Sequence, residues 1–350
     1  MSELNGQVIE DSKEHISERA VIEVMGDPVV PGTLLFSFKL SIGKMAIAGV
    51  PLFTNEAIAA LPIKRGDLLL RDFLRYALLL VSRKVDANDA VLGKLLNKKT
   101  VEDLAIPLPP LPEQERIVRI LDEADALRRL RAGADERTNR ITAALFDEMF
   151  GNPSANSKAW DTATLGSLGT VVTGNTPPRS DSSFYADFIE WVKTDNIDPT
   201  RGIVMPSAER LSQSGARRGR IIPEGSVLVT CIAGSIERIG DAAVTDRRVA
   251  INQQINAIVP SEKVDSAFLG SLVRALKPLI QRSATGVMTR IINKSELEKI
   301  PAIFPPSSLQ RKFAARMVEI RELEKKQAAC RERLDDLFQS TLYRAFQGEL

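Results

Sequence analysis

Two long stretches of this chain place apolar residues at every third or fourth position between charged ones. The first covers residues 112–150 and the second covers residues 310–346. This spacing predicts amphipathic α-helices, and the narrow apolar stripe is typical of a coiled-coil seam. A helix of about 39 residues is roughly 58 Å long, and it needs a partner because its apolar stripe is otherwise exposed to water. We expect the two helices to pair with each other, although each helix packing on its own globular domain is an alternative.

The apolar stripe of each predicted helix contains the residues that we expect at the seam. They are Ile117, Leu121, Leu127 and Leu145 in the first helix, and Phe313, Met317, Ile320 and Leu334 in the second.

The remaining parts of the chain contain short apolar runs that Gly, Pro, Asn and Asp separate. Residues 33–38, 226–231 and 254–259 read as strands, and residues 68–83 and 265–282 read as shorter helices. Strands and helices alternate here without a regular βαβ rhythm. The pattern therefore predicts an α+β protein with two mixed α/β regions and two long helices.

The chain also repeats itself at a long interval. Leu96-Asn97-Lys98 is matched 196 residues later by Ile292-Asn293-Lys294, and a Pro-rich segment follows each triplet. Each long helix then opens with a glutamine, Gln114 or Gln310, again 196 residues apart. Solenoid repeats are only about 20 to 50 residues long, so this period indicates two copies of a globular unit, each followed by a helix.

The first copy is shorter than the second at its front. Gly225 of the second copy lies 65 residues after Trp160, whereas its counterpart, Gly32, has only 31 residues before it. We expect that a late start codon, a truncation or a different front accounts for this difference. The predicted organisation is a first domain at 1–111, a long helix at 112–151, a second domain at 152–306 and a C-terminal helix at 307–350.

Composition adds few constraints. The chain has 350 residues, 44% hydrophobic residues and a net charge of +2, which is ordinary for a globular protein and neither requires nor excludes nucleic acid. Cys231 and Cys330 show no disulfide or metal spacing, which favours a reducing compartment. We see no signal peptide and no apolar run near the ~20 residues of a membrane span, so we expect a cytoplasmic protein without membrane contact.

The sequence lacks the usual residues of an active site. His15 is the single histidine, and no P-loop or dinucleotide fingerprint is present. Lys13 and Lys326 each lie two residues after an acidic residue, a spacing found in some nucleases. Neither pair is accompanied by the second aspartate that such a site requires. We therefore predict no catalytic, cofactor or metal site, and a standalone nuclease is the weakest alternative.

Several motifs resemble the specificity subunits of Type I restriction-modification systems. They include the junction at residues 106–114, the Gly174-Asn175-Thr176-Pro177 turn and the Trp191-Val192-Lys193-Thr194 segment. The chain departs from the family pattern at residues 237–240, which are inserted relative to the first copy, and in the degraded joint at 304–308. The resemblance covers nearly the whole chain.

This resemblance implies a sequence-specific DNA-binding subunit that is not itself an enzyme. Two target recognition domains would each read one half of a bipartite site, and the two long helices would form an antiparallel coiled coil that sets their separation and docks partners. Half-sites read from one face of DNA lie about 34–36 Å apart or a multiple of it. The implied partners are double-stranded DNA, two methyltransferase subunits and restriction/translocase subunits, which would bind S-adenosylmethionine, ATP and magnesium. An alternative is a truncated remnant that docks methyltransferase but reads only one half-site.

DNA contacts require polar or cationic side chains on loops and helix ends. The candidates in the second copy are Asn175, Thr176, Arg179, Lys193, Thr194, Arg217, Arg218, Arg220, Asn252, Gln253 and Arg290. The weaker analogues in the first copy are Lys39, Lys44 and Asn55. For each of them, a plain surface loop or a side chain that caps its own turn is the competing interpretation.

Overall fold

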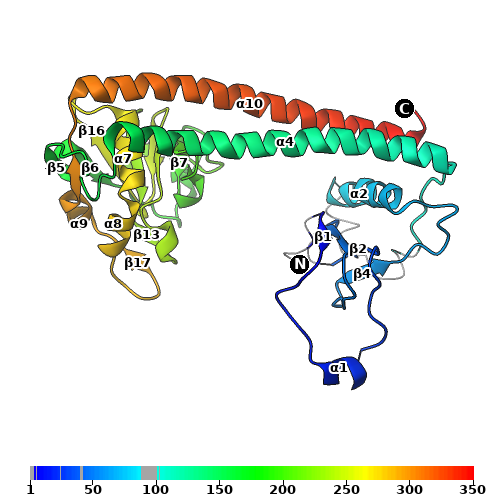
Figure 1. The fold of residues 1–350 in the computed structure, drawn as a ribbon. Helices are drawn as coiled ribbons and strands as arrows, with labels where there is room; N and C mark the ends of the chain where they lie inside the picture. Colours follow the sequence, from blue (N-terminus) through cyan, green and yellow to red (C-terminus); the bar gives the residue numbers. More distant parts are fainter. Residues whose placement is uncertain (1–3, 5, 24, 40–41, 88–100, 102) are drawn as a thin grey trace. The chain divides into compact units, whose positions relative to one another are not determined.

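The computed structural model describes residues 4–350 except 5, 24, 40, 41, 88–100 and 102 (Figure 1). The chain divides into two compact units. Unit 1 consists of Met1–Arg131 and Ala329–Leu350, and unit 2 consists of Ala132–Ala328. The long helices α4 (Leu111–Phe150) and α10 (Ser307–Gln347) each contribute a segment to both units. The Leu96-Asn97-Lys98 triplet lies outside the described residues.

Unit 1 contains a four-stranded sheet of order β1-β3-β2-β4. Its elements are β1 (Val8–Ile9), α1 (Glu18–Glu23), β2 (Leu34–Ser37), β3 (Met45–Ala48), β4 (Ile58–Leu61) and α2 (Arg71–Ala87). Strand β2 is antiparallel to both β3 and β4, and β1 is parallel to β3.

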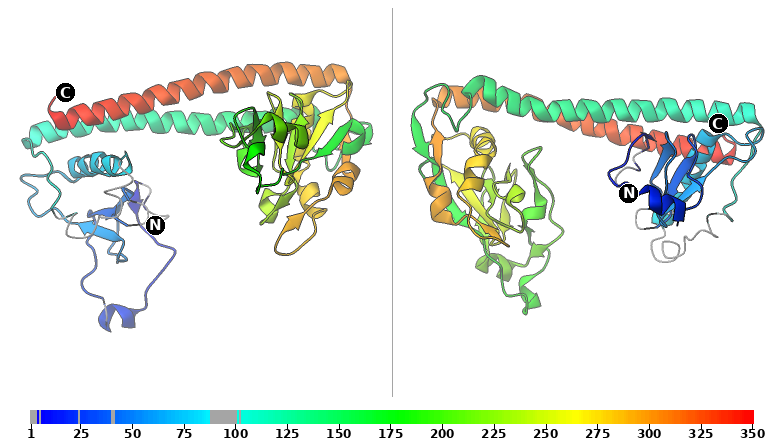
Figure 2. Two further views of the ribbon diagram at one scale, coloured as in Figure 1. Left: turned by 180° about the vertical axis from the view of Figure 1, so that it is seen from behind. Right: turned by 60° about the horizontal axis from the view of Figure 1, so that its bottom comes forward.

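Helix α2 lies between this sheet and the helix segments of unit 1 (Figure 2). Its residue Leu78 packs in one buried cluster with Phe36 of β2. Its opposite face presents Phe73, whose ring centroid lies 5.0 Å from that of Phe346 in α10. The Tyr76 hydroxyl also donates a hydrogen bond of 2.6 Å to a carboxylate of α4. The helix pair therefore covers the side of α2 that the sheet leaves open.

Unit 2 is larger and has two main sheets, of orders β6-β16-β12-β14-β9-β8 and β10-β7-β15-β11, and two short ones, β18-β5 and β13-β17. Its strands are β5 (Thr162–Thr164), β6 (Gly169–Thr173), β7 (Ile189–Val192), β8 (Ile197–Asp198), β9 (Ile203–Val204), β10 (Arg210–Leu211), β11 (Arg220–Ile222), β12 (Val227–Thr230), β13 (Ile232–Ala233), β14 (Ala242–Val244), β15 (Val249–Ile251), β16 (Ile255–Pro260), β17 (Arg290–Ile291) and β18 (Pro301–Ile303). Its helices within the domain are α5 (Leu165–Leu168), η1 (Ser182–Phe184), η2 (Thr194–Asn196), α6 (Gln213–Arg218), η3 (Ile236–Arg238), α7 (Ser266–Ala275), α8 (Lys277–Arg282) and α9 (Lys294–Lys299).

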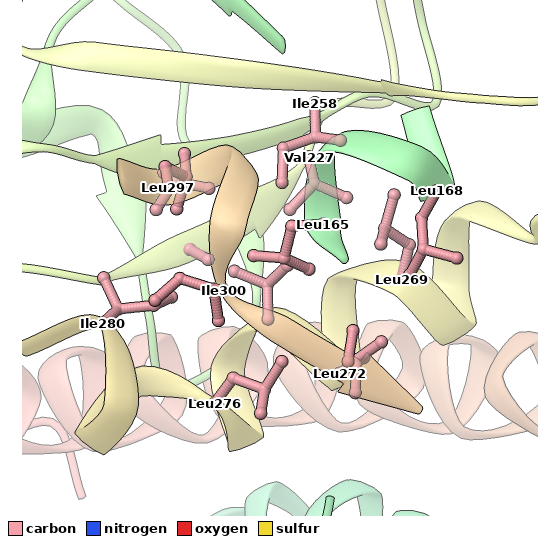
Figure 3. Close-up of a cluster of buried hydrophobic side chains, with 14 of the residues drawn as sticks. Leu165, Leu168, Val227, Ile258, Leu269, Leu272, Leu276, Ile280, Leu297 and Ile300 are labelled. Carbon is pink, nitrogen blue, oxygen red and sulfur yellow. The ribbon is translucent and has the colours of Figure 1, made fainter. Parts of the chain in front are cut away.

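Helix α7 occupies in unit 2 the position that α2 occupies in unit 1, between the sheet and the helix pair. Leu269 and Leu272 pack into the largest buried cluster together with Val227 of the six-stranded sheet (Figure 3). Phe268 of α7 contacts the ring of Phe150 in α4, with ring centroids 4.9 Å apart. Each unit therefore has the same layers, in the order sheet, helix and helix pair.

The strand arrangement of the two units also agrees. The neighbours of β2 are β3 and β4, just as the neighbours of β12 are β14 and β16, and all four pairs are antiparallel. Strand β1 lies parallel to β3 as β9 lies parallel to β14. This common topology accounts for the repeat that we noted in the sequence.

The two glutamines that open the long helices perform the same structural task, and both are fully buried. In unit 2, Gln310 accepts a hydrogen bond from the Asp265 N–H (2.9 Å) and donates one to the Pro305 carbonyl (2.8 Å). In unit 1, Gln114 accepts from the Leu70 N–H (2.9 Å) and donates to carbonyls of residues 68 and 109. Each glutamine thus ties the start of a long helix to the start of α2 or α7.

Helices α4 and α10 pack antiparallel within each unit. In unit 1, Arg128 Nε lies 2.6 Å from Asp335 Oδ1. In unit 2, Gln327 donates a hydrogen bond of 3.0 Å to the Thr138 hydroxyl, and the Phe146 ring contacts that of Phe313. Because residue numbers rise along one helix and fall along its neighbour, the helices run in opposite directions.

One predicted helix is wrong in detail. Residues 265–282 form two helices, α7 and α8, and not the single helix that the apolar spacing indicated. Pro278 lies at the start of α8, and its missing N–H prevents a continuous ladder of helical hydrogen bonds through that turn. The apolar residues on both sides of the break still face the same core, which explains why their spacing looked continuous.

Candidate nucleic-acid interface

Several strands of unit 2 end at one common edge. Strands β7 and β15 run parallel, with Ile251 opposite Val192, so both end at the same level. Strands β6 and β12 end where β16 begins, because Thr173 pairs with Asn256 and Thr230 pairs with Ile255. The turn between β15 and β16 joins these two sheets. The loops that follow β6, β7, β12 and β15 therefore gather along this edge.

The loop after β6 begins with Gly174, which the packing requires. A Cβ at this position would lie 2.1 Å from the carbonyl oxygen of Asn252. Asn175 donates a side-chain hydrogen bond of 2.6 Å to the Arg218 carbonyl, and its own carbonyl accepts one from the Trp191 indole at 3.3 Å. These contacts hold the loop in place between β7 and α6.

A second group at this edge forms around the carboxylate of Glu209. Arg179 Nη2 lies 2.7 Å from Glu209 Oε2, and the Lys193 ammonium binds Oε1 of the same carboxylate. The hydrogen bond from Lys193 and, to a smaller extent, that from Arg179 hold the pKa of Glu209 below its ordinary value, although burial opposes them. The Arg179 guanidinium also lies over the rings of Tyr185 (4.8 Å) and Trp191 (4.7 Å). Glu209 therefore holds both cations in place, and the side chains of Arg179 and Lys193 remain partly exposed.

The densest basic cluster is at the end of α6. Arg217 and Arg218 occupy the last turn of this helix and are exposed, and Arg218 lies 4.9 Å from the centroid of the Phe184 ring. Arg220, also exposed, follows on β11 opposite Ile251. Among the described residues, none of these three side chains forms an ion pair with a carboxylate, so their charge is available to an anionic partner.

Two predicted contact residues face the protein, and we correct their assignment. Asn252 is only 4% exposed, and its side chain both accepts from the Gln254 N–H and donates to the Gln254 side chain. It caps its own turn, which was the competing interpretation. Thr194 is 8% exposed. Neither side chain is free to reach a base or a phosphate without a change of structure.

Other predicted residues remain at the surface. Gln253 is exposed and accepts a hydrogen bond from the Thr176 hydroxyl, which links the loop after β6 to the turn after β15. Arg290 is half-buried on β17, and its guanidinium donates to the Gly286 carbonyl. Strand β17 pairs with β13, which follows β12 and therefore extends from the same edge.

The candidates in unit 1 occupy the equivalent edge. The end of β2 meets the start of β3 and the start of β4, because Phe36 pairs with Met45 and Ser37 pairs with Ile58. The exposed residues that follow or precede these strand ends are Lys39, Lys44 and Asn55. Asn55 also caps its own turn by accepting from the N–H of residue 57 at 3.1 Å.

The eight predicted seam residues differ in burial. Ile117 and Leu121 lie in the buried cluster of unit 1, and Phe313 and Met317 lie in that of unit 2. The partly buried members are Leu145, Ile320 and Leu334. Leu127, however, is 51% exposed and does not belong to the packed seam. The buried side chains stabilise the chain itself, so a docking protein would contact other faces of the helices.

Sequence reasoning missed Glu209 and Arg238. Arg238 Nη1 lies 2.8 Å from Asp195 Oδ1, and Nη2 donates to the Thr194 carbonyl at 2.9 Å. Both residues act across loops distant in sequence, so no local spacing indicates them. Among the described residues, no group of three His, Cys, Asp or Glu side chains is placed to hold a metal ion. No helix within the described ranges is both long and apolar enough to cross a membrane.

The layered units and their polar loop edges are those of a recognition protein built from a duplicated domain. The family model described as "Type I restriction modification DNA specificity domain" matches residues 27–137 and 157–329, and the chain belongs to this family. This membership confirms the prediction of a non-catalytic specificity protein. The fold shared with solved structures confirms the predicted fold class.

Two relatives are named specificity subunits, and both have low sequence identity to this chain. The chain is 28% identical to the Type I restriction enzyme HindI specificity subunit of Haemophilus influenzae over 201 residues, which are 55% of this chain and only 42% of that protein. It is 23% identical over 327 residues to the MjaIX specificity subunit of Methanocaldococcus jannaschii, covering 87% of this chain and 74% of that protein.

Two solved structures share the fold. One belongs to a study of complex assembly and conformational transition of the type I R-M system, with a TM-score of 0.60, 19% identity and coverage of 92% of this chain and 83% of the other. The other is the S subunit of a Type I restriction-modification system from M. genitalium, with a TM-score of 0.54, 13% identity and coverage of 92% and 84%.

Proposed function

We propose that this chain is the sequence-specific DNA-binding subunit of a Type I restriction-modification system, and that each unit reads one half of a bipartite target in the cytoplasm. The observation that carries this proposal is the edge of strand ends in unit 2. Loops from four strands meet there and present cationic and polar side chains on a rigid sheet. Binding residues commonly occupy loops that a rigid scaffold positions.

The charges at this edge suit DNA. Arg217 and Arg218 are exposed and form no ion pair among the described residues, so they can neutralise phosphates. Arg179 and Lys193 share one carboxylate, which leaves this pair with a net positive charge. Gln253 is an exposed amide on the turn after β15 at the same edge, and amides can form two hydrogen bonds with adenine. The edge therefore offers both positioning contacts and a possible reader of bases.

The equivalent edge of unit 1 supports the bipartite part of the proposal. Lys39, Lys44 and Asn55 are exposed where β2, β3 and β4 meet, which matches the position of the loops in unit 2. Two units of one topology, each with a loop-bearing edge, provide two surfaces for two half-sites. The domain boundaries expected from the sequence at 111, 151 and 306 remain part of this proposal.

We further propose that the helices dock two methyltransferase subunits and, through them, restriction subunits. Several large apolar side chains remain exposed on the helix segments of each unit, where a protein partner would cover them. They are Leu127, Leu130, Leu337 and Tyr343 in unit 1, and Ile141, Val318 and Leu323 in unit 2. S-adenosylmethionine, ATP and magnesium would be bound by those partners, which would carry out the chemistry.

Selection from a random duplex pool tests the proposal. The full-length chain, co-purified with its methyltransferase subunit, should enrich two short conserved blocks separated by a spacer of constant length. A single enriched block would favour the alternative of a scaffold that reads one half-site. Recovery of unselected sequence at moderate salt would contradict specific DNA binding altogether.

A further inference from the structure

A tight hairpin extends from the loop-bearing edge of unit 2. The Thr285 N–H donates to the Ile291 carbonyl at 2.8 Å, and the Ile291 N–H donates back at 2.9 Å. Gly286 turns the chain with a φ of +91°, and a Cβ there would lie 2.1 Å from the Thr289 carbonyl oxygen. A side chain at this position would therefore distort the turn, so the hairpin tip has a defined conformation.

The tip of this hairpin presents two apolar side chains to solvent. Val287 is 87% exposed and Met288 is 89% exposed, which are the highest values for large hydrophobic residues in the part of the chain that the structure describes. Figure 1 shows the loop before β17 at the end of unit 2 opposite its α10 segment. Two adjacent hydrophobic residues at a constrained tip suit a contact surface, because neither contributes to the core.

The sequence of the first copy contains the same arrangement. Val91-Leu92 lies 196 residues before Val287-Met288, and Lys94 occupies the position of Arg290. Residues 91–94 lie outside the described residues, so this match is one of sequence alone. The recurrence of an apolar pair followed by a cation in both copies is expected if the pair serves each reading unit.

A cation stands at the base of this hairpin. Arg290 lies on β17 and donates to the Gly286 carbonyl, whereas Arg238 of η3 is paired with Asp195. Strand β13, which supports the hairpin, begins two residues after β12 ends, so the hairpin continues the same loop-bearing edge. An apolar tip with a cation at its base, on the same edge as the other basic loops, suits DNA, whose bases offer apolar contact between two lines of phosphates.

We propose that this hairpin enters the major groove and that Val287 and Met288 read thymine through its 5-methyl group. This inference rests on the proposed function. Two paired strands lie about 4.8 Å apart before their side chains are added, so the ribbon fits the major groove, which is ~12 Å wide, and not the minor groove of ~6 Å. The thymine methyl is the apolar group exposed in the major groove, and side chains without hydrogen-bonding groups recognise it by contact alone.

The test compares thymine with deoxyuridine, which differs only by the missing methyl group. A duplex enriched from the random pool by the wild-type chain is resynthesised with deoxyuridine in place of each thymine in turn. We expect about fourfold weaker binding of the wild-type complex for each methyl group that the tip contacts, from the free energy of burying one carbon. The Val287→Ser/Met288→Ser variant should bind the thymine duplex at the weaker level and no longer distinguish the two duplexes.

Met205→Ser is the matched control, because Met205 is an exposed apolar residue of the same unit that follows β9, at the end of the sheet opposite the loop-bearing edge. It should keep the full preference for thymine. If the wild-type complex binds its selected duplex tightly but does not distinguish deoxyuridine at any position, the hairpin inference is wrong and the proposed function stands. The inference is also wrong if the double variant loses the same affinity for the thymine duplex as for the deoxyuridine duplex, because the preference for thymine would then remain. Failure of the wild-type complex to select any duplex would instead refute the proposed function.

Discussion

Replacing Gln310 by methionine should destabilise unit 2, because methionine fills a similar volume but forms neither of the two hydrogen bonds. The Asp265 N–H and the Pro305 carbonyl would lose their partner at a fully buried position. A buried group left without a hydrogen bond costs about 1–3 kcal/mol, so two such groups cost about 2–6 kcal/mol. Some relaxation of the Pro-rich joint is expected, and we predict a loss near ~3 kcal/mol.

Hydrogen exchange followed by mass spectrometry measures this loss unit by unit. A loss of ~3 kcal/mol corresponds to roughly 100-fold faster exchange through opening. Peptides from α7 should show this acceleration, since Asp265 caps that helix by accepting from the N–H groups of Ala267 and Phe268. Gln213→Met is the control, because Gln213 is exposed on α6 and its replacement removes no buried partner.

The counterpart Gln114→Met should act on unit 1 in the same way, with acceleration in α2 and little change in α7. Gln114 forms three partly buried hydrogen bonds and Gln310 forms two hydrogen bonds, so the replacement of Gln114 should cost at least as much. If Gln310→Met leaves the exchange of α7 within twofold of the wild type, the reasoning that these amides join the helices to the domains is refuted.

Three further outcomes follow from the surface groups and thiols. Arg217→Ala/Arg218→Ala should weaken binding to all duplexes and flatten the slope of log K against log salt by about 1.8, whereas altered base preference at an unchanged slope would contradict a phosphate role. The lowered pKa of Glu209 keeps its carboxylate ionised at neutral pH, and its ion pairs are lost only as pH falls through that lowered value. Glu209→Gln should therefore release Arg179 and Lys193 and tighten DNA binding at pH 7. Weaker binding would instead mean that Glu209 holds these two cations in the position that DNA binding requires. Burial raises the pKa of Cys231 to about 12. At pH 8 a disulfide reagent should therefore modify only the exposed Cys330 in the folded chain, and both thiols after denaturation. Two rapidly reacting thiols in the folded chain would contradict the buried position of Cys231.

Much of the architecture follows from the sequence because duplicated segments keep the same structural tasks. The 196-residue spacing of Gln114 and Gln310 reflects two amides that join helices in the same way. The three- and four-residue spacing of apolar positions predicts α4 and α10 because a helix brings these positions onto one face. The same rule did not detect the break at Pro278, since residues on both sides of it face one core.

The tertiary structure alone decided which polar residues of the loops face outward. Asn252 and Gln253 are adjacent, yet the first caps a buried turn and the second is exposed. The pairing of Arg179 and Lys193 through Glu209 joins three loops, and the order and register of the strands determine this meeting. Local spacing reports which face of an element is buried, but it carries no information on which loops come together. For this protein, the sequence therefore determined the repeated units and their helices, and the fold of the sheets determined the composition of the loop-bearing edge.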